Sequence, residues 1–162
     1  MSPEKISSYI REFAFKAGFE KVGIAPAAIY KEDKDNLENW LSKNRNGSMN
    51  WVADRIEERA NLFSYYPEAR SVIVVGMNYY TGLSSKENSA RFSNYAWGED
   101  YHIILKKKLF EIFDGVKKID PVIDGIVCVD TAPIMEKSWA QRAGIGWIGK
   151  HTNLLTREYS SW

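Results

Sequence analysis

The sequence contains a single cysteine, Cys128, among its 162 residues. One thiol cannot form an internal disulfide, a cysteine zinc site or a self-contained iron–sulfur cluster. Long apolar stretches are also missing, because the longest run, at residues 72–75, is far too short to cross a bilayer. The N-terminal segment lacks the continuous apolar stretch of a signal peptide. The sequence therefore predicts a cytoplasmic protein without membrane association.

Neither sign of charge predominates, since 22 Lys and Arg residues stand against 21 Asp and Glu residues, for a formal net charge of +1. The average field therefore gives no reason to expect strong unspecific attraction to nucleic acid or anionic lipid. Hydrophobic residue types make up 44% of the chain and aromatic types 14%, which excludes wholesale disorder. The length suits one globular domain, and no internal repeat or linker divides the chain.

Hydrophobic spacing predicts helices and strands in alternation. An amphipathic helix over residues 6–17 is expected to end at Gly18, and a strand over 19–25 to follow it. Further helical segments are expected at 36–43, in parts of 55–70, at 105–116 and from Pro133 to 142. Strands are expected at 71–77, apolar enough for the centre of a sheet, at 126–129 and at 153–156. Residues 79–97 are expected to form a long loop of the kind that often carries function.

A glycine cluster at residues 144–149, Gly-Ile-Gly-Trp-Ile-Gly, matches the dinucleotide-binding pattern in its spacing alone. That site needs a preceding strand, a following helix and small residues near the pyrophosphate. Here a helix is expected before the cluster, Trp147 lies within it, and no helical periodicity follows. We therefore reject a Rossmann site. Two interpretations remain equally open: a tight turn that presents backbone amides to a ligand, or simple loop geometry.

Asp130 follows the apolar residues 126–129 and precedes the helix expected to begin at Pro133. The position suits an N-terminal helix cap, which the sequence by itself favours. The alternative is a carboxyl group that points into a cleft, where burial would have to outweigh the helix dipole for Asp130 to donate a proton near neutral pH. Cys128 is expected to be a small buried hydrophobe rather than a nucleophile. Lysines 106–108 are expected to face mostly solvent.

Five separated blocks of the sequence, taken in order, carry a family resemblance. They are 23–26 (Gly-Ile-Ala-Pro), 70–80, 95–102 (Tyr-Ala-Trp-Gly-Glu-Asp-Tyr-His), 129–136 (Val-Asp-Thr-Ala-Pro-Ile-Met-Glu) and 139–150 with the glycine cluster. Together they closely resemble the N-terminal cobalamin-binding domain of the epoxyqueuosine reductases. The likeness covers nearly the whole chain, and no single block would suffice for it.

This family reduces the epoxide of epoxyqueuosine, at the wobble position of the tRNA anticodon, to the alkene of queuosine. The resemblance therefore implies an oxidoreductase of queuosine biosynthesis that uses cobalamin and receives electrons through two 4Fe–4S clusters. It also implies an α+β fold with a central mixed or antiparallel sheet flanked by helices, similar to reductive dehalogenases, the cobalamin-processing chaperone and nitroreductase-like domains. Residues 1–162 would then form a single cobalamin-binding domain.

By motif, the resemblance implies that Asp130 protonates the departing epoxide oxygen and also contacts the cofactor. Opening an epoxide leaves an alkoxide, a very strong base, so a positioned proton donor is what this step needs. A corrin is a broad, largely apolar ring edged with amides, which an aromatic-rich loop and a glycine turn would suit. No protein ligand to a metal is expected. The expected cofactor contacts besides Asp130 are Arg59, toward the corrin side groups, and Ser93, Lys150, His151, Asn153 and Leu154.

The ferredoxin-like and helical-repeat regions of the family have no counterpart in this sequence. We therefore expect the chain by itself to lack a route for electrons and to be inactive, with tRNA and the electron donor contacting mainly those other regions. His151 and Ser160 also stand where the family usually has Asn and Gly. Two other functions stay open: a non-catalytic cobalamin-binding or trafficking module, and an FMN-dependent nitroreductase-like enzyme.

Overall fold

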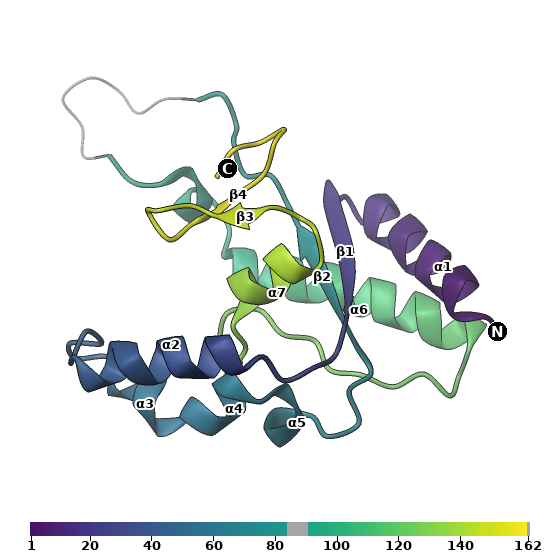
Figure 1. The fold of residues 1–162 in the computed structure, drawn as a ribbon. Helices are drawn as coiled ribbons and strands as arrows, with labels where there is room; N and C mark the ends of the chain where they lie inside the picture. Colours follow the sequence, from purple (N-terminus) through teal and green to yellow (C-terminus); the bar gives the residue numbers. More distant parts are fainter. Residues whose placement is uncertain (84–90, 162) are drawn as a thin grey trace.

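The computed structural model describes residues 1–83 and 91–161 of the chain (Figure 1). The expected loop at 79–97 lies partly outside these residues. In chain order the elements are α1 (Pro3–Lys16), β1 (Lys21–Pro26), α2 (Lys31–Ser42), α3 (Asn50–Asp54), α4 (Ile56–Ala60), α5 (Leu62–Tyr65), β2 (Ser71–Gly76), the 3-10 helix η1 (Asn94–Ala96), α6 (Tyr101–Ile119), α7 (Glu136–Arg142), β3 (Trp147–Ile148) and β4 (Leu154–Leu155).

Strands β1 and β2 pair as an antiparallel ribbon in which Val22 lies opposite Val75 and Gly23 lies opposite Val74. Side chains alternate between the two faces of a strand, so Val22, Ile24 and Val75 share one face, whereas Gly23 and Val74 share the other. Helices α1 and α6 lie on one side of this ribbon and α7 on the other (Figure 1). Each face of the ribbon therefore has a core of its own.

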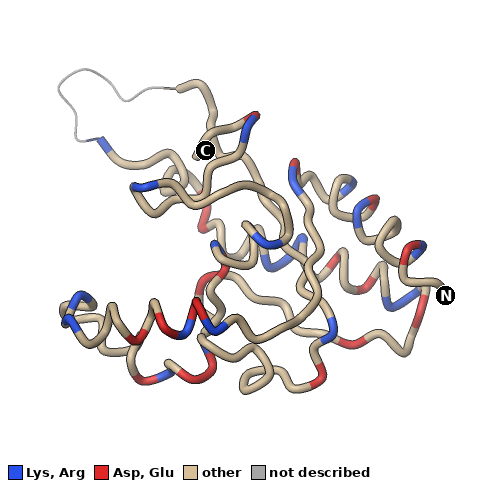
Figure 2. The backbone as a smooth tube through the Cα atoms, in the orientation of Figure 1, with Lys and Arg blue, Asp and Glu red and all other residues tan. Residues whose placement is uncertain are grey.

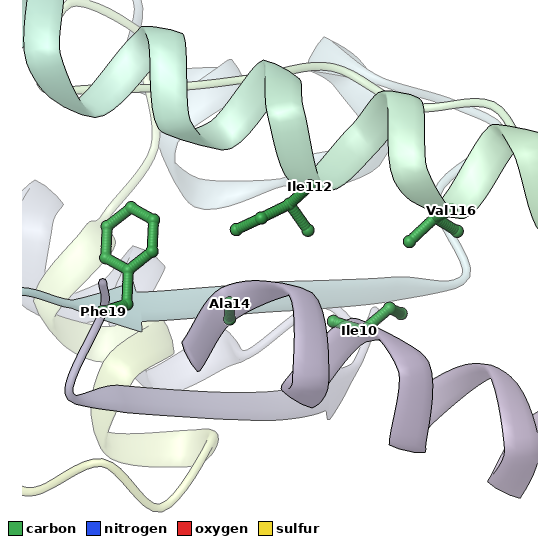
Figure 3. Packing of buried hydrophobic residues seen from close by; sticks show 5 residues of the cluster. All are labelled: Ile10, Ala14, Phe19, Ile112 and Val116. Atoms are coloured by element: carbon green, nitrogen blue, oxygen red, sulfur yellow. The ribbon is translucent and has the colours of Figure 1, made fainter. Parts of the chain in front are cut away.

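The first core lies where α1 and α6 pack together over the Val22 face. Spacings of four residues place Ile10 and Ala14 on one face of α1 and Ile112 and Val116 on one face of α6. These four side chains and Phe19 are each at most 8% exposed and form a single cluster (Figure 3). The expected amphipathic patterns of both helices are therefore confirmed.

The second core lies between α7 and the Gly23 face of the ribbon. Trp139 is 6% exposed and packs with Ala25 and Leu62. A Cβ atom on Gly23 would stand 2.3 Å from the backbone oxygen of Ala143, just past the end of α7, so only glycine lets the helix approach this closely. This contact sets the distance of α7 from the ribbon.

Of the three consecutive lysines, Lys106 and Lys108 are half-buried. The Nζ atom of Lys108 donates a hydrogen bond to the Ala17 carbonyl at the end of α1. Gly18 follows with φ of +86°, a left-handed conformation that commonly ends helices. Lys107 is exposed, as expected. Lys108 thus ties α6 to the C-terminal end of α1.

Three of the expected elements need correction. The ribbon of β1 and β2 has two strands, so neither strand is central. Residues 126–129 form no strand: Val129 is 5% exposed but Ile126 is 47% exposed, because a short apolar run predicts burial without providing a pairing partner. Helix α7 begins at Glu136 instead of Pro133, which is fully buried in the bend before it. The fold therefore combines helices with small antiparallel ribbons instead of a central sheet.

The glycine cluster leads from α7 into a second antiparallel ribbon, β3 with β4. A Cβ atom on Gly146 would stand 2.0 Å from the Leu155 carbonyl oxygen, so this glycine permits close approach of the two strands. The Gly149 amide donates to the Asn153 carbonyl at 2.9 Å, and the Ile148 amide donates to a side chain of α7 at 3.0 Å. The Gly149 and Ile148 amides therefore serve the turn and α7 and are not available to a ligand.

Basic and acidic residues are interspersed along the described backbone (Figure 2). This distribution agrees with the formal net charge of +1. Within the described residues, no helix combines the length and the apolar character that crossing a membrane requires.

The contact at Gly23 can be tested by Gly23→Ala. The added methyl group has to push α7 away from the ribbon, so we expect the free energy of unfolding to fall by about 1–3 kcal/mol in urea denaturation. Gly125→Ala is the matched control, since its Cβ atom would make only an ordinary 3.4 Å contact with Phe113. Equal effects of the two substitutions would contradict the proposed close approach.

Candidate functional site

Asp130 lies in the bend that joins the buried Val129 to α7. The residue capping α7 is Met135, so the structure rules out the cap role that the sequence favoured for Asp130. Asp130 has φ of +51°, a left-handed conformation that is uncommon for residues other than glycine. Its side chain is about half exposed. The carboxyl group is therefore available for chemistry instead of being used by a helix end.

Two consecutive residues at the start of α6 face this carboxyl group. The Tyr101 hydroxyl donates a hydrogen bond to Oδ2 of Asp130, and Nε2 of His102 lies 3.5 Å from the same oxygen. The two rings stack with their centroids 4.1 Å apart. Asp100 caps α6 by accepting the His102 amide at 2.9 Å, and its Oδ1 also lies 2.8 Å from Nδ1 of the His102 ring. The helix cap thus orients the imidazole that faces Asp130.

The Tyr101 hydroxyl stays protonated at neutral pH. Its hydrogen bond to the Asp130 carboxylate is the main cause that raises the pKa of Tyr101 to about 12, with burial as the second cause. On the other side of the imidazole, the hydrogen bond from His102 lowers the pKa of Asp100. The site therefore holds a phenol that donates and an imidazole set between two carboxyl groups.

Glu136, the first residue of α7, contacts Asp130 from the opposite side. Its Oε1 atom accepts the Asp130 backbone amide at 2.8 Å. Burial is the main cause that raises the pKa of Glu136 to about 7. Cys128, expected to be a buried hydrophobe, is half-buried, and burial and the nearby Glu136 charge raise the pKa of its thiol, which disfavours a nucleophilic role.

A cleft of about 400 Å³ opens between the β1–β2 ribbon, residues 77–79 and 93–95, and the β3–β4 ribbon with the residues that follow it. Three of the expected cofactor contacts, Ser93, Asn153 and Leu154, line it. Its volume lies in the range of small-molecule sites. The other described lining residues are Glu20, Lys21, Gly76, Met77, Asn78, Tyr79, Tyr95, Ile145, Thr156, Tyr159, Ser160 and Ser161.

A series of tyrosines connects this cleft to Asp130. Tyr79 and Tyr95 line the cleft and meet edge to face, with their centroids 6.1 Å apart. Tyr95 in turn meets the Tyr101 ring edge to face at 5.8 Å. Since the Tyr101 hydroxyl bonds to Asp130, the acid lies beside the cleft, separated from it by two rings. Asp130 itself is not among the described residues that line the cleft.

Two of the expected contacts, Lys150 and His151, stand at the exposed turn between β3 and β4 and do not line the cleft among the described residues. A Cβ atom on Gly149 would stand 2.6 Å from the His151 ring, so the ring packs back against its own turn. The Nζ atom of Lys137 on α7 donates to the Thr152 carbonyl at 2.7 Å and so ties this turn to α7.

Arg59 lies apart from the cleft, on α4, where it borders a small cavity of about 10 Å³ together with Tyr30, Asp33 and Trp139. Its guanidinium lies 5.0 Å from the centroid of the Trp51 ring, and burial lowers its pKa. Its Nε atom is buried without a hydrogen-bond partner among the described residues. The structure therefore does not bring Arg59 together with Ser93, Asn153 and Leu154.

Sequence reasoning missed Glu136, although a signal was present. Glu136, Trp139 and Ala140 are spaced as neighbours on one helix face, and two of the three are apolar. An acid on such a face is expected to be buried and therefore paired or shifted in pKa. The contact between Tyr101 and Asp130, 29 residues apart, gave no comparable signal.

The raised pKa of Glu136 predicts a specific loss of stability as pH rises. The folded chain holds the Glu136 proton up to pH of about 7, whereas the unfolded chain releases it near its ordinary pKa of about 4.5. In that interval the unfolded state binds fewer protons, so the free energy of unfolding falls with pH. As pH rises from about 4.5 to about 8, the free energy of unfolding of Glu136→Gln should therefore increase relative to that of wild type by on the order of 1–3 kcal/mol. Urea denaturation at several pH values measures this change. For the control Glu111→Gln, at an exposed position of α6, the difference in free energy of unfolding from wild type should be the same at every pH.

Comparisons with known proteins agree with the expected family. The family model described as "Epoxyqueuosine reductase QueG, DUF1730" matches residues 59–131. The epoxyqueuosine reductase of Cyclobacterium marinum is 38% identical over 160 residues, which make up 98% of this chain and 52% of that protein. The chain therefore spans about half the length of this curated relative.

Solved structures give the same result. The epoxyqueuosine reductase of Streptococcus thermophilus superimposes with a TM-score of 0.87 at 26% identity, covering 98% of this chain and 44% of that one. An epoxyqueuosine reductase crystallised with an epoxyqueuosine-modified tRNA-Tyr stem loop gives a TM-score of 0.84, also at 26% identity, over 98% of this chain and 43% of that one. By sequence and by fold, this chain is therefore similar to the epoxyqueuosine reductases, of which it spans about half.

Proposed function

We propose that this chain is the cobalamin-binding, proton-donating part of an oxidoreductase that converts epoxyqueuosine in tRNA to queuosine. The observation that carries the proposal is the Asp130 carboxyl group, which caps no helix and is met by Tyr101 and His102 from the start of α6. A cleft that three of the expected cofactor contacts line is separated from this group by the rings of Tyr95 and Tyr101. Because the chain spans about half of its relatives, the activity of the whole enzyme remains part of the proposal.

The lining of the cleft fits the edge of a corrin. Ser93, Asn78 and Asn153 offer hydroxyl and amide groups to the amides that rim such a ring, while Tyr95 and Leu154 offer apolar surface to its plane. Cobalamin, when bound, would supply the reducing chemistry that no side chain of this chain can perform. Ser93, Asn153 and Leu154 are the residues that we propose to hold it.

Asp130 would deliver the proton that the reaction requires. Reduction of an epoxide to an alkene releases the oxygen as water, so two electrons and two protons must arrive. The first proton goes to the oxygen as its carbon–oxygen bond breaks, because the alkoxide formed there is a far stronger base than a carboxylate. Tyr101 keeps its own proton, since its pKa is raised to about 12, and therefore orients the Asp130 carboxyl group instead of competing with it as an acid.

His102 offers a route by which Asp130 can regain a proton. When Nδ1 of the ring donates to Asp100, Nε2 faces Oδ2 of Asp130 at 3.5 Å and carries a second proton only if the ring is cationic. That distance exceeds a hydrogen bond, and catalytic contacts of this kind commonly tighten when substrate binds. Asp100, as a fixed helix cap, would hold the imidazole in place during the transfer.

The remaining functions of the family require residues outside this chain. A single cysteine cannot hold the 4Fe–4S clusters that the family resemblance implies, so we propose that electrons arrive from another region or protein. Contact with tRNA is proposed by analogy with the relative crystallised with a modified tRNA stem loop. We also propose that residues 1–162 act as one cobalamin-binding domain, with the expected likeness to reductive dehalogenases, the cobalamin-processing chaperone and nitroreductase-like domains.

The identity of the cofactor can be tested by adding hydroxocobalamin and FMN separately and recording visible spectra. We expect a saturable change with hydroxocobalamin and none with FMN. Ser93→Trp should fill the cleft and weaken cobalamin binding at least about tenfold, which corresponds to the loss of one or two good contacts. Ser8→Trp, at an exposed position of α1, is the control. Binding of FMN instead would favour the nitroreductase-like function.

The role of Asp130 can be tested by Asp130→Ala in an enzyme that joins this chain to the cluster-bearing region of the family. Loss of a general acid should lower kcat for epoxide loss about 10²–10⁴-fold while leaving cobalamin uptake unchanged. Asp114→Ala, an exposed acid on α6, should behave like wild type. Full turnover by Asp130→Ala would refute the proton-donor role. A protein that binds cobalamin but never turns over would instead match the trafficking module.

A further inference from the structure

The bend that carries Asp130 is anchored at both of its ends by buried residues. Val129 before it is 5% exposed, Ala132 after it is 8% exposed and Pro133 is fully buried. Between these anchors, Asp130 adopts φ of +51° and its neighbour Thr131 is exposed. A non-glycine residue keeps this conformation only when surrounding contacts hold it. The hydrogen bonds of Asp130 are therefore the contacts that can hold this conformation and orient its carboxyl group.

We propose that Glu136 is a positioning residue that holds Asp130 in its left-handed conformation by accepting the Asp130 backbone amide. The bond runs from the Asp130 nitrogen to Oε1 of Glu136 over 2.8 Å. With the amide fixed from the α7 side, the Asp130 side chain is directed to the opposite side, where Tyr101 and His102 meet it. We call this hydrogen bond between Glu136 and Asp130 the latch. The latch does not depend on the proposed function, whereas its role in proton donation rests on that function.

The position of Glu136 suits a latch because its own helix cannot shift easily. Trp139 and Ala140, one turn further along α7, are 6% and 4% exposed. The end of α7 lies against Gly23 of the ribbon, with no room for even one added methyl group. Glu136 therefore projects from a fixed support, and the bend is the part that would move if the bond were lost.

The charge environment indicates that the acceptor oxygen, more than the charge, is what matters. Asp130 and His102 face Glu136, and Cys128 lies close enough for the Glu136 charge to affect its thiol. Lys106 acts on the Cys128 thiol from α6. Burial raises the pKa of Glu136 to about 7, so both protonation states occur near neutral pH. A carboxyl group offers an acceptor oxygen in either state. An amide in its place should therefore keep the latch.

The experiment compares Glu136→Gln, which keeps the acceptor oxygen, with Glu136→Ala, which removes it. Glu136→Met also removes the acceptor but fills the same buried space, so it replaces the alanine variant if that one does not fold. The first readout is the hydrogen-exchange rate of the Asp130 amide, measured by NMR on this chain. We expect exchange to be about tenfold faster without the acceptor, as for the loss of one hydrogen bond to a charged group, and to change less than about threefold in Glu136→Gln. Glu111→Ala is the matched control.

The second readout is turnover in the enzyme that contains the cluster-bearing region and cobalamin. Variants without the acceptor should lower kcat about tenfold or more while leaving KM for the modified tRNA unchanged, and Glu136→Gln should restore kcat to within about threefold of wild type. Equal losses in Glu136→Gln and Glu136→Met would overturn the proposal, because they would make charge the required property. Unchanged exchange at Asp130 in Glu136→Met would also overturn it.

The two readouts separate this proposal from the proposed function. If exchange at Asp130 responds as expected but Asp130→Ala retains full turnover, the latch stands and the proton-donor role fails. If Asp130→Ala abolishes turnover while the exchange rate of the Asp130 amide is unchanged by the Glu136 substitutions, the proton-donor role stands and the latch is wrong.

Discussion

Close packing of α7 against the β1–β2 ribbon is the contact on which the candidate site depends. The helix can reach the ribbon only because Gly23 has no side chain where the Ala143 carbonyl lies. Burial of Trp139 in the resulting core then fixes the helix along its length. Since Glu136 is the first residue of that helix, its carboxyl group has a defined place, and the Asp130 amide is bound to it.

The site also draws on the opposite face of the same ribbon. Helix α6 is held there by the cluster that includes Ile112 and Val116, and its first two residues are Tyr101 and His102. Asp130 therefore connects two cores that are separate within the fold, through its amide to α7 and through its side chain to α6. A short antiparallel ribbon with a packed helix on each face is enough to bring these groups together, although the chain separates them by some thirty residues.

The site and the cleft divide the chemical tasks between them. The cleft combines hydroxyl, amide and aromatic groups suited to a large ring with polar edges, and the tyrosines at its border lead to Asp130. In the proposed function Asp130 donates the proton, and its orientation relies on Tyr101, His102 and Glu136. The high pKa of Tyr101 and the raised pKa of Glu136 are consequences of that arrangement, the first from a hydrogen bond and the second from burial.

The sequence by itself determined the amphipathic helices, the strands of the first ribbon and the family resemblance, because hydrophobic spacing and the order of motifs are local properties of a chain. Through the resemblance it also pointed to Asp130 and to three residues that line the cleft, Ser93, Asn153 and Leu154. Only the tertiary structure decided that Asp130 caps no helix, that Arg59 lies apart from the cleft and that residues 126–129 have no strand partner. It alone revealed the contacts of Asp130 with Tyr101 and Glu136. Such pairings depend on how distant elements pack against one another, and no local pattern of residues encodes the distance between two helices on opposite faces of a ribbon.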